Sequence, residues 1–360
     1  MKPALNVETI QALPKVDLHR HLEGSLRLAT LWEFHCREKQ TLHTSFDALR
    51  AACVIAAGER PGFLAFLNYF SALRFKFGGS EALERIAAET VADAAADGVI
   101  HLELRFSAVH AARRMKSDPG LHASQPPPAM ADVETAATAV IRGARREAAA
   151  CRIGVSFICS LGRNFGQDVN RPAVELLHHD IGAEFTGIDL AGDESFSARP
   201  FAWAFQMWKV AGRKLTIHAG EDPCGSGAAS VSDAITEFKA DRIGHGVRVI
   251  EDQETLAQVI REKIALEMCL TSNVQTRACD SFAAHPIKKL LEAGARVTLN
   301  SDDPAISVTT LSHEYFRAAQ DCGLDWAQLR QCAINASESV FLPEQEKSAL
   351  VKRMTEAWPQ

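Results

Sequence analysis

His19 and His21 are the first residues of this chain whose type and spacing could do chemistry. They end a short alternation of apolar and polar residues that begins at Val16, and residues two apart in a β-strand point to the same side. Two imidazoles placed in this way could bind one metal ion, because neutral imidazole is a common metal ligand. A pair of surface histidines is the plain alternative, and the pair alone does not decide between the two.

Polar residues of metal-ligand or proton-transfer type also follow several other apolar runs. They lie at 189–194, 216–221, 244–246 and 300–304. In an α/β barrel the active site is built from residues at the carboxyl ends of the strands. One such coincidence means little, but four together predict a site at one end of a barrel.

A third histidine and an aspartate could complete a metal site. His218 ends an apolar run, so a barrel would place it level with His21. With His19 and Asp302 added, the set has three imidazoles and one carboxylate but no thiolate, which suits Zn²⁺ and leaves a position open for water. A water bound there would lose a proton near neutral pH and become a nucleophile. The alternatives are a hydrogen-bonded core histidine for His218 and a solvated turn for Asp302.

Candidates for proton transfer lie beside this set. Glu221 follows the third histidine by three residues, which is near enough to deliver a proton to a substrate without binding metal. His245, between two glycines, is a candidate base or electrostatic partner for the water. Asp303 follows the aspartate ligand, so that one acid of the pair could serve the metal and the other the substrate. A two-metal site on this fold would usually need a lysine in 189–194, where none is present, so we expect a single metal.

The strands that must carry these residues are predicted from eight short, mostly apolar runs: Val16–His19, Ile100–Ser107, Ile153–Ser160, Gly187–Ala191, Lys214–His218, Arg242–His245, Ile264–Cys269 and Arg296–Asn300. Helical patterns lie between most of them, at Glu81–Asp97, Asp132–Ala150, Arg199–Ala211, Val231–Phe238, Glu254–Glu262 and Ala284–Ala293. Parallel strands covered on both faces have near-continuous apolar sequences. Eight strand–helix units therefore predict an α/β protein with a closed (β/α)8 TIM barrel. We interpret 1–360 as one domain.

Two segments depart from a minimal barrel. The segment of about 22–98 after the first strand has helical patterns at Leu28–Glu38 and Pro61–Phe75, so we expect a helical insertion that covers the catalytic face. Met115–Met130 is rich in proline and predicts an exposed loop. Extra helices are expected after the last strand, at Thr310–Gln320, Trp326–Val340 and Glu344–Met354.

Composition narrows the class of protein. The net charge is −6 and no basic stripe stands out, which argues against a nucleic-acid partner. The nine cysteines include no Cys-x-x-Cys pair, so we expect reduced thiols and a cytoplasmic location. No stretch approaches the roughly 18 apolar residues of a membrane helix, and 1–13 lacks the apolar core of a signal peptide. The oligomeric state is left open.

These motifs, in this order, resemble the adenosine deaminase family of the amidohydrolase superfamily. The resemblance runs from Leu13 to about Leu342 and is carried by Asp17–Ser25, Asp189–Glu194, His218–Glu221, Arg242–Val247, Thr271–Thr276 and Asn300–Pro304. It implies hydrolytic loss of ammonia from C6 of an aminopurine nucleoside, with water as co-substrate. Adenosine and 2′-deoxyadenosine would become inosine and 2′-deoxyinosine.

The resemblance also implies a role for each site residue. One zinc ion per subunit would be held by His19, His21, His218 and Asp302. Glu221 would protonate purine N1, and His245 would orient and deprotonate the bound water. Substrate contacts would come from Asp303 at N7, from the backbone N–H of Gly192 at N3, and from His21 and Glu23.

One departure concerns the substrate. Glu23 stands where adenosine deaminases commonly have aspartate, near the sugar. A longer acid there also resembles adenine deaminases and aminofutalosine deaminases, so adenine or an aminofutalosine-type nucleoside is an alternative substrate. A non-catalytic binding barrel is an alternative of another class. The zinc signature of the cytidine and tRNA-adenosine deaminases is absent, which disfavours a role in editing nucleic acid.

Overall fold

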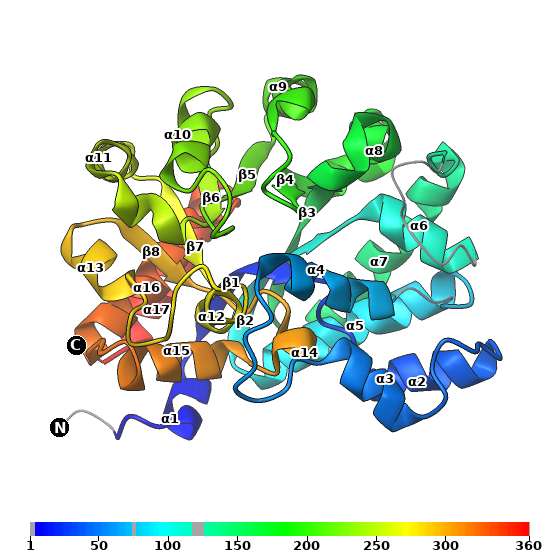
Figure 1. Ribbon diagram of the computed structural model, residues 1–360, viewed down its shortest axis with the longest axis horizontal. Helices are drawn as coiled ribbons and strands as arrows, with labels where there is room; N and C mark the ends of the chain where they lie inside the picture. The colour runs from blue at the N-terminus through cyan, green and yellow to red at the C-terminus, as the bar shows by residue number, and fades with distance from the viewer. Residues whose placement is uncertain (1–3, 74–76, 117–125, 360) are drawn as a thin grey trace.

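A single parallel sheet forms the centre of the molecule. The computed structural model describes residues 4–73, 77–116 and 126–359. The sheet has the order β1 to β8, and each neighbouring pair is parallel. Its strands are β1 (Lys15–His21), β2 (Val99–Phe106), β3 (Gly154–Gly162), β4 (Phe185–Ala191), β5 (Lys214–Ala219), β6 (Arg242–His245), β7 (Ala265–Met268) and β8 (Arg296–Leu299). Figure 1 shows the strands surrounded by helices, and the predicted (β/α)8 barrel is confirmed.

The barrel closes between its first strand and the residues after its last. Arg20 and Asp302 form a parallel bridge there. The backbone N–H of His21 donates to the carbonyl of Asp302 at 2.9 Å, and the N–H of Asp302 donates to the carbonyl of His19 at 2.8 Å. Asp302 has a φ of 57°, which is uncommon for a residue with a side chain. Closure therefore fixes the backbone at the residues predicted to bind metal.

Helices cover the outside of the sheet. The chain places between its strands α5 (Ser80–Ala96), α6 (Ala108–Lys116), α7 (Met130–Cys151), α8 (Gly166–Glu175), α9 (Ala202–Val210), α10 (Ala228–Thr236), α11 (Gln253–Arg261), α12 (Leu270–Gln275) and α13 (Ile287–Glu292). The sequence did not predict α6, α8, which contains Pro172, or the short α12. After β8 come α14 (Pro304–Ser307), α15 (Leu311–Gln320), α16 (Trp326–Ser339) and α17 (Glu344–Ala357).

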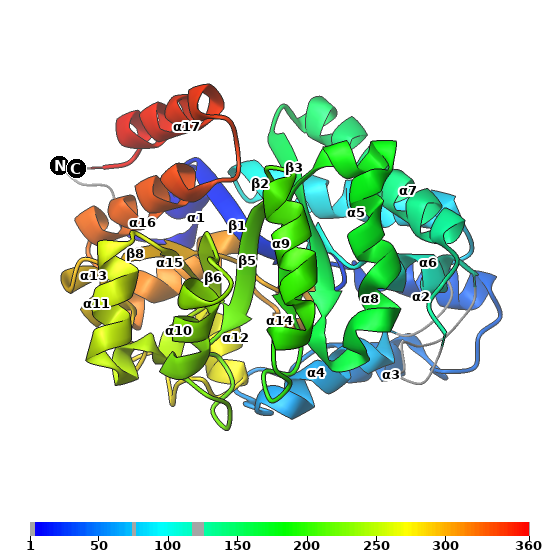
Figure 2. The ribbon, with the colours of Figure 1, turned by 90° about the horizontal axis from the view of Figure 1, so that it is seen from above.

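The insertion between β1 and β2 is helical, as expected. A short α1 (Val7–Gln11) precedes β1, and the insertion holds α2 (Leu28–Arg37), α3 (Phe46–Cys53) and α4 (Phe63–Ala72). In Figure 2, α4 lies across the end of the barrel toward which the strand arrows point, and α17 lies at the other end. The insertion is thus on the predicted catalytic side.

Parts of two predictions fall outside the described residues. They are 74–75 of the predicted helix Pro61–Phe75 and 117–125 of the predicted loop. That 1–360 forms one domain stays a prediction. Within the described residues, no helix is both long and apolar enough to cross a membrane.

Apolar side chains of the strands supply much of the core. Val16 and Leu18 of β1, and Leu102 and Leu104 of β2, are fully buried. Burial of such a side chain contributes about 1.5–3 kcal/mol relative to exposure. This core keeps the strand ends rigid, which a site assembled from several strands requires.

Candidate active site

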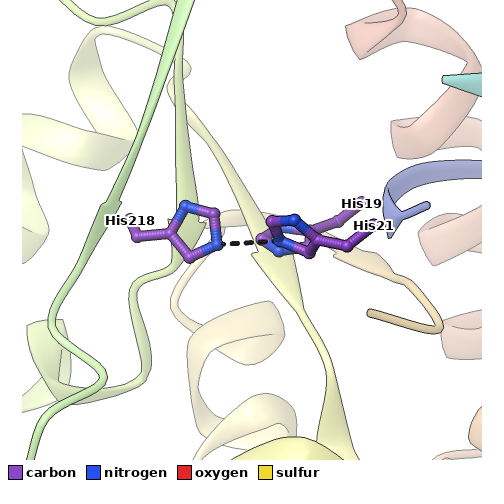
Figure 3. Close-up of side chains that lie close together, drawn as sticks. All are labelled: His19, His21 and His218. Carbon is purple, nitrogen blue, oxygen red and sulfur yellow. Dashed lines mark hydrogen bonds between the residues drawn. The ribbon is translucent and has the colours of Figure 1, made fainter. Parts of the chain in front are cut away.

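The structure brings three of the predicted ligands together. His19 and His21 come from β1 and His218 from β5, and Figure 3 shows His21 and His218 facing each other. The Nε2 atoms of His21 and His218 are 3.2 Å apart. One ring nitrogen from each of the three histidines lies within 4.8 Å of the other two. The predicted histidine cluster therefore exists at the C-terminal end of the barrel.

The fourth predicted ligand lies beside this cluster. Oδ1 of Asp302 is 3.3 Å from Nε2 of His19 and 3.6 Å from Nε2 of His21. His19, Asp302 and His245 form a second group whose ligand atoms lie within 4.8 Å of one another. The two groups share His19. Strand pairing explains the position of His245, because β6 places it next to Ala219, one residue after His218.

The hydrogen bonds of two histidines fit a bound metal ion. Nδ1 of His19 lies 2.8 Å from Oε2 of Glu267, and Nδ1 of His218 lies 3.0 Å from Oδ1 of Asp189. A carboxylate at Nδ1 holds the ring proton there and leaves the lone pair of Nε2 for a metal. Nε2 of His19 is buried without a hydrogen-bond partner in the described part of the chain. Burial also lowers the pKa of His21 well below its ordinary value, which favours the neutral, ligand form of its ring.

A buried ionic network supports these carboxylates, and the sequence analysis did not assign it. Arg105 lies 2.8 Å from Glu267 and 3.5 Å from Asp189, and Arg242 lies 2.6 Å from Glu267. Burial opposes ionisation of both acids, but Arg105 and Arg242 hold the pKa of Glu267 well below its usual value, and His218 and Arg105 do the same for Asp189. The sequence feature that could have indicated this network is a charged residue inside each otherwise apolar strand.

Glu221 is placed as a proton donor. Its Oε2 lies 3.3 Å from Nε2 of His245, and its Oε1 accepts a hydrogen bond from the hydroxyl of Thr276 at 3.1 Å. Burial, with Asp302 and Glu194 nearby, raises the pKa of Glu221 well above its ordinary value. This shift favours the protonated carboxyl, which is the form that an acid catalyst needs.

Two further acids face the same space. Burial, reinforced by Asp302 and Glu23, raises the pKa of Asp303 well above its ordinary value. Among the described residues, Oδ1 of Asp303 is buried without a hydrogen-bond partner. Oε1 of Glu23 accepts the backbone N–H of Ser107 at 2.8 Å, and burial raises the pKa of Glu23 too. Gly24 allows Asp303 to approach, because a Cβ on Gly24 would lie 1.8 Å from Oδ1 of Asp303.

One cavity of about 370 Å³, a size typical of small-molecule sites, is lined by the proposed ligands other than His19 and by the acids and base beside them, namely His21, His218, Asp302, Glu221, His245, Asp303 and Glu23. Apolar side chains of α4 form one wall, namely Phe63, Leu64, Phe66, Leu67 and Phe70. Gly192 lines the cavity with a φ of 93°, and a Cβ on it would lie 2.5 Å from Oδ1 of Asn164. Asn164, His110 and Arg114 also line the cavity and were not singled out from the sequence.

This fold and this site define a hydrolytic enzyme of the α/β-barrel type. The sequence model of the family described as adenosine deaminase matches residues 14–357. A curated adenosine deaminase of Erwinia tasmaniensis is 38% identical over 345 residues, covering 95% of this chain and 98% of the relative. The chain belongs to the adenosine deaminase family.

Solved structures agree with this assignment. An amidohydrolase of Burkholderia ambifaria, solved with bound Zn, is 25% identical with a TM-score of 0.85, covering 99% of this chain and 93% of the other. The adenine deaminase of Arthrobacter aurescens shares the fold at 24% identity and a TM-score of 0.82, covering 96% of this chain and 99% of the other. The chain is thus an aminohydrolase with a metal-binding site and a small-molecule substrate, which sets aside the non-catalytic barrel.

Proposed function

We propose that this enzyme removes the 6-amino group of adenosine and 2′-deoxyadenosine by hydrolysis, with one zinc ion per subunit held by His19, His21, His218 and Asp302. The observation that carries the proposal is the position of the buried Glu221, whose raised pKa favours its protonated form, next to this histidine cluster in one cavity. The names of the curated relatives support adenosine as the substrate. The neighbour with bound Zn, and a ligand set of nitrogen and carboxylate oxygen without thiolate, support zinc.

Each role follows from what the side chain can donate or accept. When bound, the metal lowers the pKa of a coordinated water so that it can act as a nucleophile near neutral pH. Glu221 gives its proton to N1 of the purine, which makes C6 more electrophilic. His245, beside Glu221, orients the attacking water. Overall, the oxygen of water bonds to C6, the bond from C6 to the amino nitrogen breaks, and the protons of water and Glu221 are redistributed so that ammonia leaves and Glu221 is restored.

We infer that the cavity supplies one donor for each ring-nitrogen acceptor of a 6-aminopurine. Purine N1, N3 and N7 each carry a lone pair, so each needs a donor. Protonated Glu221 serves N1, protonated Asp303 serves N7, and the backbone N–H of Gly192 serves N3. His21 and Glu23 face the rest of the substrate. A buried donor left unpaired costs about 1–3 kcal/mol, so a ring lacking one of these nitrogens should bind less well.

Ammonia release from adenosine by zinc-loaded protein, together with the loss of adenosine absorbance, tests the proposed function. Metal analysis of protein purified without chelator should give one zinc per chain. A zinc-loaded preparation that turns over neither adenosine nor 2′-deoxyadenosine would refute the proposed substrate.

The second candidate keeps the chemistry and changes the substrate to adenine or an aminofutalosine-type nucleoside. Glu23 favours it, because this acid lines the cavity and its hydrogen bond from Ser107 fixes where the longer side chain ends. Ratios of kcat/KM across adenosine, 2′-deoxyadenosine, adenine and aminofutalosine discriminate between the candidates. A Glu23→Asp variant that shifts these ratios toward adenosine would show that the length of this acid selects the substrate.

A further inference from the structure

We propose that Asn273 and His285 are positioning residues that hold His245 in the tautomer with its proton on Nε2, so that His245 faces the cavity as a hydrogen-bond donor. The kinetic part of this inference rests on the proposed function. Asn273, His285 and His245 are 0%, 5% and 1% exposed, so water does not compete for their hydrogen bonds. No part of the site described above assigns a role to Asn273 or His285.

The orientation of the Asn273 amide is fixed by the backbone. The N–H of Cys269 lies 3.3 Å from one amide atom of Asn273, and a backbone N–H can only donate. That atom must therefore be the acceptor Oδ1. The amide nitrogen Nδ2 is then the atom 3.1 Å from Nδ1 of His245. An amide NH₂ only donates, so Nδ1 of His245 must accept and cannot carry a hydrogen.

His285 reinforces the same orientation from outside the cavity. The backbone N–H of Ile287 donates to Nδ1 of His285 at 3.2 Å, so this nitrogen is an acceptor. Burial lowers the pKa of His285 to about 3, and its neutral ring therefore carries its single hydrogen on Nε2. Nε2 of His285 lies 3.3 Å from Oδ1 of Asn273 and donates to it. Rotating the Asn273 amide by half a turn would set its NH₂ against two donors, the N–H groups of Cys269 and His285.

The orientation of the Asn273 amide determines which ring nitrogen of His245 carries the hydrogen in the cavity. Because Nδ1 of His245 accepts, its neutral ring carries the hydrogen on Nε2, which lies 3.3 Å from Oε2 of Glu221. His245 can then orient the attacking water by donating to its oxygen. The other role considered from the sequence, a base that takes a proton from the water, needs a lone pair on Nε2. This chain of hydrogen bonds does not provide that lone pair.

Replacing Asn273 by aspartate tests the inference directly. Asn273→Asp keeps the acceptor for Cys269 and His285 but changes the NH₂ donor into a carboxylate oxygen, which also removes the hydrogen bond between the Asn273 side chain and Glu221. The ring signals of His245 therefore decide the tautomer, whereas kinetics report on both contacts. Nδ1 of His245 should then gain a hydrogen, and because burial disfavours a charged ring, Nε2 should lose its own. Ring ¹⁵N NMR distinguishes protonated from unprotonated nitrogens, and the His245 signals can be assigned by their loss in His245→Gln. We expect protonated Nε2 in the parent protein and protonated Nδ1 in Asn273→Asp, with and without zinc. Protonated Nδ1 in the parent protein would overturn the inference.

Kinetics supply the second measurement. Removal of one positioned donor to reacting atoms typically costs about 10²–10³-fold in kcat. We expect Asn273→Asp to lose kcat by about this factor with little change in KM. His285→Gln, which keeps an N–H donor and a carbonyl acceptor, should retain more kcat than His285→Leu, which keeps neither. If His245 were a base instead, Asn273→Asp would keep or raise kcat, and this result would overturn the inference.

A matched control separates positioning from packing. Asn335 is also buried, and its Nδ2 donates to the carbonyl of Val297 away from the cavity. Asn335→Asp should lower stability without changing kcat or the His245 signals. A parent protein that deaminates no aminopurine would refute the proposed function, yet the NMR result would still decide the tautomer. An active parent with unchanged kcat in Asn273→Asp would refute the inference alone.

Discussion

Glu221→Gln should separate catalysis from stability. The amide has nearly the same shape as the carboxyl and keeps an acceptor for the hydroxyl of Thr276, but it cannot give a proton to N1. General acid catalysis is worth about 10²–10⁴ in rate. We therefore expect kcat/KM to fall by about this factor, equivalent to about 3–5 kcal/mol in the activation free energy. Glu221 is not among the proposed zinc ligands, so metal analysis should still find zinc.

Although Glu221→Gln should lower kcat/KM, it should not lower the free energy of unfolding. Burial raises the pKa of Glu221 in the folded protein and so favours its protonated form, whereas the carboxyl is ionised in the unfolded chain near neutral pH. Above the unfolded pKa of about 4.3, the folded state thus binds the extra proton, and its stability falls as pH rises toward the raised folded pKa. Glutamine has no such cost. Urea unfolding of the chelator-treated proteins at pH 7 should show Glu221→Gln to be at least as stable as the parent.

The assays are zinc content, absorbance-monitored deamination of adenosine and urea unfolding. The exposed Glu292 gives a matched control, since Glu292→Gln makes the same chemical change at a residue that does not line the cavity and should alter none of the three. Activity of Glu221→Gln within a few-fold of the parent would refute its role as the acid. Loss of zinc or of stability in the variant would show that Glu221 supports the fold or the metal instead.

Three further variants test other parts of the structure. His19→Ala should lose bound metal, and a zinc content equal to that of the parent would contradict its place in the ligand set. Gly24→Ala should lower kcat/KM while leaving zinc bound, because the new Cβ would displace the carboxyl of Asp303; unchanged kinetics would disprove that contact. Burial, with Arg242 nearby, lowers the pKa of His101 to about 4, so the unfolded chain binds the extra proton below pH 6.5. Stability should fall from pH 6.5 toward pH 4 by about 1.4 kcal/mol per pH unit from this group. His101→Gln should remove that part of the slope in urea unfolding at pH 7 and pH 5, and an identical slope would count against it.

The barrel could be predicted because each strand is a short apolar run that can be recognised from its own residues. Each predicted strand overlaps an observed one, and most helices agree to within a few residues. The missed α8 contains Pro172, a residue that usually marks the end of a helix. The missed α12 is six residues long, too short for a helical period to be visible in the sequence.

Only the residues that face the cavity could be predicted from the sequence. Strand ends indicate which histidines and acids face the cavity, so the proposed ligands, Glu221 and Asp303 could be named. Their partners could not be named, because those pairings depend on which strands become neighbours. His19 and Glu267 are 248 residues apart in the chain, and their contact exists only once β1 and β7 lie in the same barrel.

The hydrogen-bond partner of Nδ1 decides which histidines can bind a metal and which one can donate a hydrogen bond to the substrate water. At His19 and His218 the partner of Nδ1 is a carboxylate, an acceptor, so the ring hydrogen stays on Nδ1 and Nε2 presents a lone pair to a metal. At His245 the partner of Nδ1 is the amide of Asn273, a donor, so Nε2 carries the hydrogen and cannot serve as a ligand in the same form. All three rings lie within about 5 Å of one another, centre to centre, in the same buried setting. Exchanging the acceptor and donor partners should therefore exchange the roles of ligand and donor, even though every histidine stays in place.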